Sequence, residues 1–461
     1  MAILLYLPKQ GKSDITINSC SIFVNELINS ISIPILIVCE TKYDKDRLNI
    51  KLDNLLNLKI VNIYELVENI DNYYPTEINR NYNYLHKIEP ERLGKNKNTR
   101  ELIDKTSYIM DDILTKNKVV CAHFGALGGA FRSIGATILQ DRLDRKKIPL
   151  YMIHDAFWKG RWRIYNNIYF GDRKAVKYYH HLNQSELDNK EKKKIDDYIE
   201  SYNNFKQTTV KDIFEEKRRT SYKFNFQSFI YRYIVNVFHL HWLKDPYKSI
   251  IKNISKTFNS VDSRNSSRQY IIYLLNKPNH WLSSYANPEL LNREKVIKTI
   301  YSNLPTGYDL ILKTHPHENI NYQLEKIVNS MKNCYISYDL NNAELYNNTK
   351  LFIFSGTTSA IDALMYKRHV IELGRKSIYF DFQNPPAKRV EQISDLRLII
   401  DECLNEKVPV NSIYAYFKSI LDNSYTFNDD VNISLKRNDE TYIKMARILA
   451  DRIDEDGVLL T

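Results

Sequence analysis

Polar and basic side chains follow a short apolar run, Asp309–Leu312, in the last third of the chain. The run predicts a buried strand, and open α/β sheets bind ligands beyond the carboxyl ends of their strands, so Lys313 and His315 are expected near a pocket. Pro316 fixes its own φ and favours an extended conformation at His315. A histidine there could donate to a phosphate oxygen or act as a general acid toward a departing phosphate. A structural histidine at a strand end is the alternative.

A second apolar run, Leu351–Phe354, leads into a cluster of glycine and hydroxyl residues and then into a predicted helix at 358–366. The cluster consists of Ser355, Gly356, Thr357, Thr358 and Ser359. Unpaired N–H groups at a helix start favour an anion, and hydroxyl groups add donors, so the cluster predicts a phosphate site. Simple capping of the helix by Thr357, Thr358 or Ser359 explains the same residues.

A third predicted strand, His369–Leu373, carries an acidic residue near its end. Glu372 could accept hydrogen bonds from ribose hydroxyls, as carboxylates do in nucleotide sites. An ordinary surface glutamate is the alternative.

The N-terminal half offers candidates for an acceptor site at two strand ends. His123 follows an apolar run and precedes flexible glycines, which let backbone approach a ligand. His154 and Asp155 end another run, and aromatic and cationic residues suited to sugar stacking and anion pairing follow, among them Trp158 and Arg161. We expect Asp155 to act as a general base toward an acceptor hydroxyl, with His154 or His123 as substitutes. A capped turn with core aromatics is the alternative.

These residues belong to two series of short apolar runs separated by helical patterns, which predict parallel sheets buried on both faces. The expected strands of the first series are 3–7, 34–39, 58–63, 118–122 and 149–153, and those of the second are 270–275, 309–312, 334–337, 351–354 and 369–373. The fold class is therefore α/β with two doubly wound domains. The expected boundaries are 1–265 for the first domain, with a helical insertion at 172–265, then 266–425 for the second and 426–461 for a helical tail.

The order K-x-H-P, then S-G-T-T-S at a helix start, then a strand ending in E-L-G resembles the C-terminal half of bacterial capsule and lipopolysaccharide glycosyltransferases of GT-B type. It looks most like those that use CMP-activated sugars, the Kdo, sialyl- and polysialyltransferases. The resemblance implies two Rossmann-like domains facing a cleft. It also implies an inverting transfer, with the donor's nucleotide phosphate held at His315, Pro316 and Thr357–Ser359.

The resemblance is incomplete in the first domain, where those families carry an acidic catalytic motif. The only similar stretch, Asp454–Gly457, lies at the wrong end of the chain. CDP-glycerol-type polyol-phosphate transferases share the motifs more loosely. A UDP-sugar 2-epimerase of similar architecture is a further alternative, as is a noncatalytic carbohydrate-assembly protein.

The composition of the chain limits which partners it is expected to bind. At 461 residues it is long enough for two domains, and its net charge of +11 fits nucleic acid, an anionic membrane or a phosphorylated substrate. The basic residues are spread along the whole chain and no nucleic-acid module is recognisable, so nucleic acid is not expected as a partner. The five cysteines have no metal-binding or redox spacing, and we expect neither a metal nor a cofactor besides the donor.

The expected partners are a nucleotide sugar and a glycan or lipid-linked acceptor of a surface polysaccharide. The N-terminus lacks the features of a signal peptide, which predicts a cytoplasmic location. The basic, aromatic stretch Tyr222–Trp242 could dock on the anionic inner face of the membrane or pack between domains.

Overall fold

The structure is a computed structural model with two compact units. Unit 1 comprises Met1–His181 and Ser419–Thr461, and unit 2 comprises Leu182–Lys418. The structure describes residues 1–7, 14–53, 55–70, 73, 99–124, 134–155, 161–167, 171–203, 269–276, 287, 290, 292–314, 322–337, 342–347, 349–357, 359–374, 380, 382, 385–426 and 439–458, with backbone alone at 14–16, 99, 155, 322–323 and 342–344.

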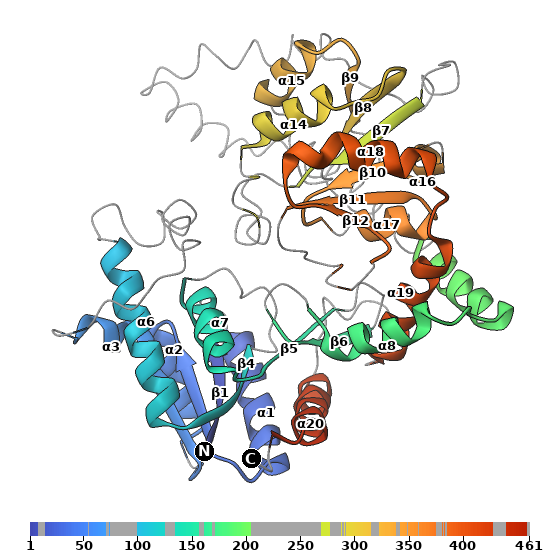
Figure 1. Cartoon of the computed structure of the whole chain (residues 1–461). Helices are drawn as coiled ribbons and strands as arrows, with labels where there is room; N and C mark the ends of the chain where they lie inside the picture. Colours follow the sequence, from blue (N-terminus) through green and yellow to red (C-terminus); the bar gives the residue numbers. More distant parts are fainter. Residues whose placement is uncertain are drawn as a thin grey trace, which may run out of the picture. The chain divides into compact units, whose positions relative to one another are not determined.

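Unit 1 is an α/β unit with a seven-stranded sheet (Figure 1). Its strands are β1 (Ala2–Leu7), β2 (Ile35–Cys39), β3 (Leu58–Asn62), β4 (Val119–Phe124), β5 (Leu150–Asp155), β6 (Arg161–Tyr165) and β13 (Tyr425–Thr426). They follow the order β13-β6-β5-β4-β1-β2-β3. β1 to β5 are parallel, whereas β6 and β13 join as an antiparallel extension.

The helices of unit 1 cover both faces of this sheet. They are α1 (Asp14–Ser30), α2 (Lys42–Lys51), α3 (Ile63–Glu68), α6 (Thr99–Lys116), α7 (Ile134–Lys146), most of α8 (Arg173–Asn183) and α20 (Asp439–Glu455). One core joins α1, α2 and α20 to alternate residues of β1, namely Ile3, Leu5 and Leu7. Every residue of β1 is buried, so a run without polar alternation is what a sheet covered on both faces requires.

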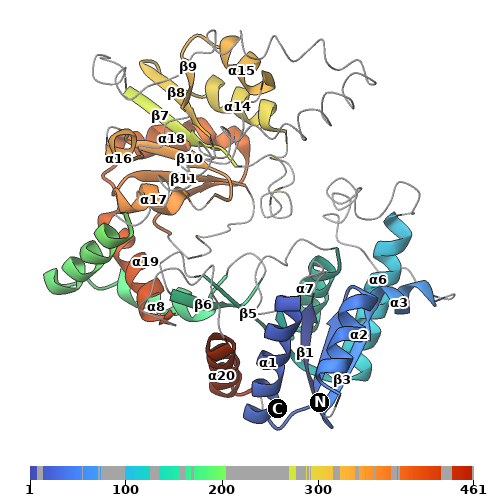
Figure 2. The same ribbon diagram turned by 180° about the vertical axis from the view of Figure 1, so that it is seen from behind.

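The C-terminal helix α20 belongs to unit 1 and lies beside α1, as both views show (Figure 2). Arg447 of α20 pairs with Glu26 of α1 at 2.6 Å. The hydroxyl of Tyr151 on β5 donates to Asp456 at 2.8 Å. The last residues of the chain therefore stabilise the first unit.

Unit 2 contains a six-stranded sheet in the order β12-β11-β10-β7-β8-β9, in which all neighbouring strands are parallel. The strands are β7 (Gln269–Leu274), β8 (Tyr308–Lys313), β9 (Cys334–Ser337), β10 (Leu351–Phe354), β11 (His369–Leu373) and β12 (Lys388–Val390). Numbered within the unit, this is the order 3-2-1-4-5-6 of doubly wound nucleotide-binding sheets.

The helices of unit 2 are α14 (Arg293–Ser302), α15 (Tyr322–Asn329), α16 (Asn342–Asn347), α17 (Ser359–Met365), α18 (Leu396–Asn405) and most of α19 (Val410–Asp422), with a 3-10 turn at Ile393–Asp395 and a helix over residues 189–203. α14, α15 and α18 bury one face of the sheet. On the other face, Tyr346 of α16 packs its ring against Phe352 of β10 with centroids 4.7 Å apart. The predicted α/β class is therefore confirmed in both units.

The boundaries between the units lie elsewhere than the sequence predicted. The chain passes from unit 1 to unit 2 inside α8 and returns inside α19, at Lys418/Ser419 rather than after residue 425. The predicted boundary at 265/266 lies outside the described residues, and so does Tyr222–Trp242. The cleft between the domains stays a prediction. None of the helices that the structure describes has the length and apolarity needed to span a bilayer.

Candidate functional site

The strand order of unit 2 contains one switch point, between β7 and β10. From β7 the chain continues outward through β8 and β9, and from β10 it continues the other way through β11 and β12. Connections that leave two adjacent parallel strands in opposite directions open a crevice beyond their carboxyl ends, which is where such sheets bind ligands. The residues after Leu274 and Phe354 therefore form the candidate site.

Three residues from different elements meet at this switch point. The side-chain amide of Asn276, just after β7, donates to the carbonyl oxygen of Ser355, just after β10. The guanidinium of Arg293, the first residue of α14, donates to the carbonyl oxygen of Asn276 at 2.9 Å. One hydrogen bond thus joins the ends of β7 and β10, and a second joins the end of β7 to α14.

The hydroxyl cluster lies in a tight turn at the same place. Gly356 has a φ of 70°, in the left-handed region that favours glycine, and reverses the chain after β10. The hydroxyl oxygen of Thr357 accepts from the backbone N–H of Ser359 at 3.4 Å, and the side chain of Ser359 is hydrogen-bonded to Tyr346. Capping therefore accounts for part of this cluster. α17 has only seven residues, so its dipole adds little and the case for a ligand rests on the switch point.

Two predicted charged residues lie on one transverse row of the sheet. The register aligns Lys313 with Leu274, Leu274 with Phe354, and Phe354 with Glu372. Their side chains point away from the core shared with α14 and α18, because the alternate residues of these strands form that core. Three strand spacings, roughly 14 Å, separate Lys313 from Glu372. The two charges therefore act at opposite ends of the site.

Both charged residues are almost covered. Lys313 is 7% exposed and Glu372 only 1%. Glu372 also lies beside Arg389 of β12 in the register, on the same face of the sheet. A carboxylate with this burial beside a cation is better placed to order the sheet edge than to bind a ribose. The predicted ribose contact thus stays a prediction with a structural alternative.

A second amide, Asn287, lies against the end of β11. Gly374 has a φ of 121°, and a Cβ atom there would overlap the side chain of Asn287, which is 1% exposed. Only glycine allows this conformation and this approach together. Asn276 and Asn287 therefore lie against the ends of two strands, β10 and β11.

His123, a predicted acceptor-binding residue of unit 1, lies in the core of the unit. The ring of His123 on β4 is 1% exposed, stacks on Phe23 at 5.2 Å between centroids, and has its Nδ1 2.9 Å from the carbonyl oxygen of Tyr151. Burial lowers the pKa of His123 to about 3, so the ring is neutral. A buried, neutral ring is typical of a core histidine, so the predicted acceptor contact of His123 stays a prediction with a structural alternative.

The other unit 1 candidates lie on the antiparallel edge of the sheet. His154 is partly buried on β5 and pairs in register with Arg163 of β6, and the backbone of Asp155 ends β5. Arg161 donates to the carbonyl oxygen of Leu421 at 3.2 Å and to the hydroxyl of Ser424 at 2.9 Å. Arg161 therefore holds the chain that follows α19, which is a structural alternative to the predicted pairing with an anion.

Four predicted site residues lie outside the described residues: Trp158, His315, Pro316 and Thr358. Their predicted roles stay predictions. The side chain of Asp155 is likewise outside the description.

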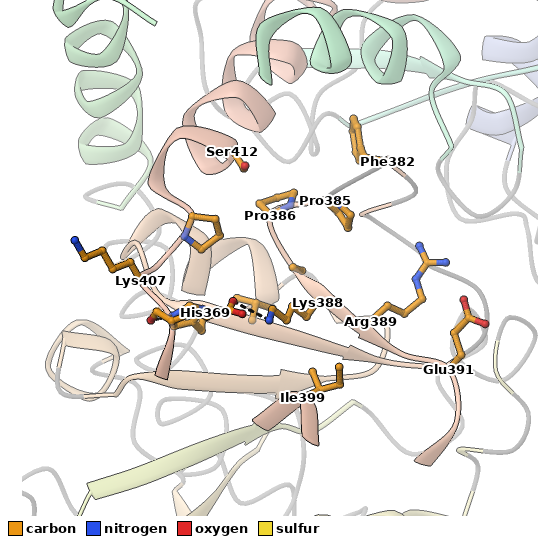
Figure 3. Close-up of a pocket in the computed structure, with 14 residues that line it drawn as sticks. His369, Phe382, Pro385, Pro386, Lys388, Arg389, Glu391, Ile399, Lys407 and Ser412 are labelled. Atoms are coloured by element: carbon orange, nitrogen blue, oxygen red, sulfur yellow. Dashed lines mark hydrogen bonds and ion pairs between the residues drawn. The ribbon is translucent and has the colours of Figure 1, made fainter. Parts of the chain in front are cut away.

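A separate pocket of about 580 Å³ lies along β12, the edge strand of unit 2 (Figure 3). Phe382, Pro385 and Pro386 form one side of it, and His369 lies at the amino end of β11. The ammonium group of Lys388 on its floor pairs with Glu402 at 2.9 Å and Glu406 at 2.8 Å. Because its central cation is neutralised within the protein and it does not lie at the switch point, this pocket is a poor candidate for phosphate.

The described residues contain no group of three or more histidine, cysteine, aspartate or glutamate side chains placed to hold a metal ion. All five cysteines are buried and free. Burial raises the pKa of the Cys20, Cys121 and Cys403 thiols to about 12, which makes them unreactive.

Sequence reasoning missed Asn276, Asn287 and Arg293. Asn276 stands just after β7, Arg293 begins α14 and Asn287 lies between them in the chain, in stretches that carry no motif. Asn276 and Arg293 are important because the strand order places β7 next to β10, and Asn287 because it lies against Gly374 after β11; a linear pattern contains neither relationship.

No protein-family model matches the chain, and no curated protein sequence matches it. Solved structures give distant likenesses. A glycosyltransferase from Rickettsia africae ESF-5 has 11% identity and a TM-score of 0.31, with 99% of each chain covered. The beta Kdo 2,4 transferase KpsC of Thermosulfurimonas dismutans has 10% identity and a TM-score of 0.31 over 65% of this chain and 79% of the other.

The UDP-GlcNAc 2-epimerase of Methanocaldococcus jannaschii, solved with UDP-GlcNAc and UDP, has 10% identity and a TM-score of 0.28 over 98% of this chain and all of its own (100%). Likenesses at this level assign neither an activity nor a substrate to this chain.

Proposed function

We propose that this protein is a nucleotide-sugar-dependent glycosyltransferase whose donor nucleotide binds at the switch point of unit 2. The observation that carries the proposal is the gathering of Asn276, Ser355, Thr357 and Ser359 beyond the carboxyl ends of β7 and β10. Hydroxyl and backbone N–H groups at this position of a doubly wound sheet suit phosphate oxygens, and Asn276 holds the turn that carries them.

The central strands of unit 1 follow the same order as those of unit 2, but a negative charge lies at the start of α7, the helix after β4. There the carboxylate of Glu40, after β2, accepts a hydrogen bond from Tyr6 and lies at the start of α7. A carboxylate already occupies the positive end of that helix, and it would repel a phosphate. The charge distribution therefore favours the nucleotide in unit 2 over unit 1.

The chemistry proposed is a single inverting displacement. An acceptor hydroxyl attacks the anomeric carbon, the bond from that carbon to the phosphate oxygen breaks, and the nucleotide leaves with the electron pair. The hydroxyl proton passes to a base, for which Asp155 is our candidate. Lys313 and the N–H groups after β10 would stabilise the charge on the leaving phosphate, with His315 as its proton donor.

The donor proposed is a CMP-activated sugar such as CMP-Kdo or CMP-sialic acid, and the acceptor is a surface-polysaccharide or lipid-linked glycan. This choice is supported by the order of the K-x-H-P, S-G-T-T-S and E-L-G motifs. A CDP-glycerol-type polyol-phosphate transferase and a UDP-sugar 2-epimerase are the outcomes that would replace it.

The test is a thermal-shift series with CMP, CDP, UDP and GDP on the full chain, followed by product analysis. A ligand at 100 times its dissociation constant stabilises a protein by about 2.7 kcal/mol, which gives a readable shift. We expect the largest shift with CMP, and glycosylated product from a CMP-sugar when acceptor is present.

Other results would redirect or refute the assignment. Stabilisation by UDP together with conversion of UDP-GlcNAc in the absence of acceptor would establish the epimerase instead. Transfer from CDP-glycerol would establish the polyol-phosphate transferase. The absence of a shift with all four nucleotides would refute a nucleotide site.

A further inference from the structure

The turn at Ser355–Ser359 is held from outside by residues of another connection. Asn276 follows β7 and Arg293 begins α14, yet together they reach the carbonyl oxygen of Ser355 after β10. We propose that Asn276 and Arg293 are positioning residues of the nucleotide site, which set the orientation of the turn that would face the phosphate. This proposal rests on the function proposed above.

The physical argument begins with the peptide between Ser355 and Gly356. A trans peptide is planar, so a hydrogen bond that fixes the carbonyl of Ser355 also fixes the direction of the N–H of Gly356. The next rotation, φ of Gly356, is 70° and is open to glycine without strain. Because Gly356 can rotate freely, the turn alone does not set the direction of this peptide, and the hydrogen bond from the amide of Asn276 sets it.

The turn then transmits this orientation into α17. After Gly356, the hydroxyl of Thr357 accepts from the N–H of Ser359, and Ser359 is the first residue of the helix. A rotation of the peptide after Ser355 would move the Thr357 hydroxyl and the N–H groups beside it. These are the donors that the proposed phosphate site uses.

Arg293 holds the backbone of Asn276 in place. Its guanidinium donates to the backbone carbonyl of Asn276 at 2.9 Å. Asn276 is thereby held through its backbone by α14 and joined through its side chain to β10. The chain Arg293–Asn276–Ser355 links three elements across the switch point, and neither Asn276 nor Arg293 has to contact the ligand itself.

The experiment compares nucleotide affinity and stability in matched variants. Asn276→Ala removes the donor to Ser355, and Arg293→Gln removes the guanidinium while leaving Asn276 in place. Asn303→Ala is the control, because Asn303 also donates its amide to a backbone carbonyl, that of Thr299 at 2.8 Å, but at the opposite end of α14. Dissociation constants for the nucleotide that stabilises the wild type most are measured by calorimetry, beside melting temperatures without ligand.

We expect Asn276→Ala and Arg293→Gln to weaken binding by about tenfold each, and Asn303→Ala to leave it unchanged. The Arg293→Gln variant serves if Asn276→Ala does not fold. Lower melting temperatures with unchanged dissociation constants would overturn the positioning role and leave the proposed function intact. A wild type that binds none of the nucleotides would overturn the proposed function and the positioning role together.

Discussion

The hydroxyl of Tyr6 donates a hydrogen bond of 2.7 Å to the carboxylate of Glu40, and both groups are buried at the carboxyl end of the first sheet. Gly135, the second residue of α7, makes room for this pair. A Cβ atom at Gly135 would overlap the Tyr6 hydroxyl and lie 3.2 Å from a Glu40 oxygen. The absence of a side chain at Gly135 is therefore a packing requirement.

Gly135→Ala is expected to destabilise unit 1 by about 1–3 kcal/mol, because overpacking displaces neighbouring groups. Urea denaturation measures the change. In a Tyr6→Phe background the overlapping oxygen is gone, so the same substitution should be much less harmful. Equal losses in the two backgrounds would show that the Tyr6 hydroxyl is not what excludes a side chain.

A buried ion pair holds α8 against β6. Arg163 donates to one oxygen of Asp172 at 3.0 and 2.8 Å, and Asp172 also accepts from the N–H of Ala175. Both side chains are 4% exposed. Asp172→Ala should destabilise the protein by about 3–5 kcal/mol, because it leaves the charge of Arg163 buried without its partner.

The matched comparison is Glu294→Ala, which breaks the exposed pair between Glu294 and Lys298. That change should stay within about 0.5 kcal/mol, as exposed pairs contribute little. The midpoints of urea denaturation of both variants measure this difference in stability. A small effect of Asp172→Ala would mean that Arg163 finds another acceptor.

The burial of His123 predicts a dependence of stability on pH. Its pKa is lowered to about 3 in the folded chain, chiefly by burial, while an unfolded histidine titrates near 6.5. Between these values the unfolded state binds the extra proton, so stability falls as pH decreases through this window and is unaffected above it.

His123→Gln, which stays neutral, should narrow the stability difference between pH 7 and pH 4.5 relative to the wild type. Melting temperatures of both proteins across this range test it. Parallel curves for the two proteins would show that His123 does not contribute to acid sensitivity.

The candidate base is tested by kinetics. Asp155→Asn should lower kcat at saturating donor by about 10²- to 10⁴-fold, the usual contribution of general base catalysis, and leave donor affinity unchanged. His154→Gln is the comparison on the neighbouring position. Undiminished transfer by Asp155→Asn would remove Asp155 from the mechanism and turn attention to His154.

The strands were the most predictable part of the fold. Three predicted runs, Cys334–Ser337, Leu351–Phe354 and His369–Leu373, coincide with β9, β10 and β11, and the others differ by one or two residues at their ends. Continuous apolar runs indicate such strands clearly, because the strands of a sheet covered on both faces contain few polar residues.

β6, β12 and β13 were not predicted. β6 lies in the aromatic and cationic run after Asp155 that suggested sugar stacking and anion pairing, but within it Trp162 is buried in the core and Arg163 pairs with Asp172. The β-branched and aromatic residues of this run are also typical of a strand, a signal that the charges obscured.

The loop residues of the candidate site could be predicted from the sequence, but the residues that hold those loops in place could not. The hydroxyl run at Ser355–Ser359 has a compositional signature, whereas Asn276 gains its role only because β7 and β10 are neighbours. Likewise His123 looked like a ligand from its place after a run, and only packing against Phe23 identified it as a core residue.

The central claim, that a nucleotide binds at the switch point of unit 2, is tested most directly by hydrogen–deuterium exchange with and without a saturating nucleotide. The account predicts slower exchange in peptides covering Ser355–Ser359 and Lys313–Thr314. Binding that slows exchange only in unit 1, around Tyr6, Glu40 and the start of α7, would contradict it.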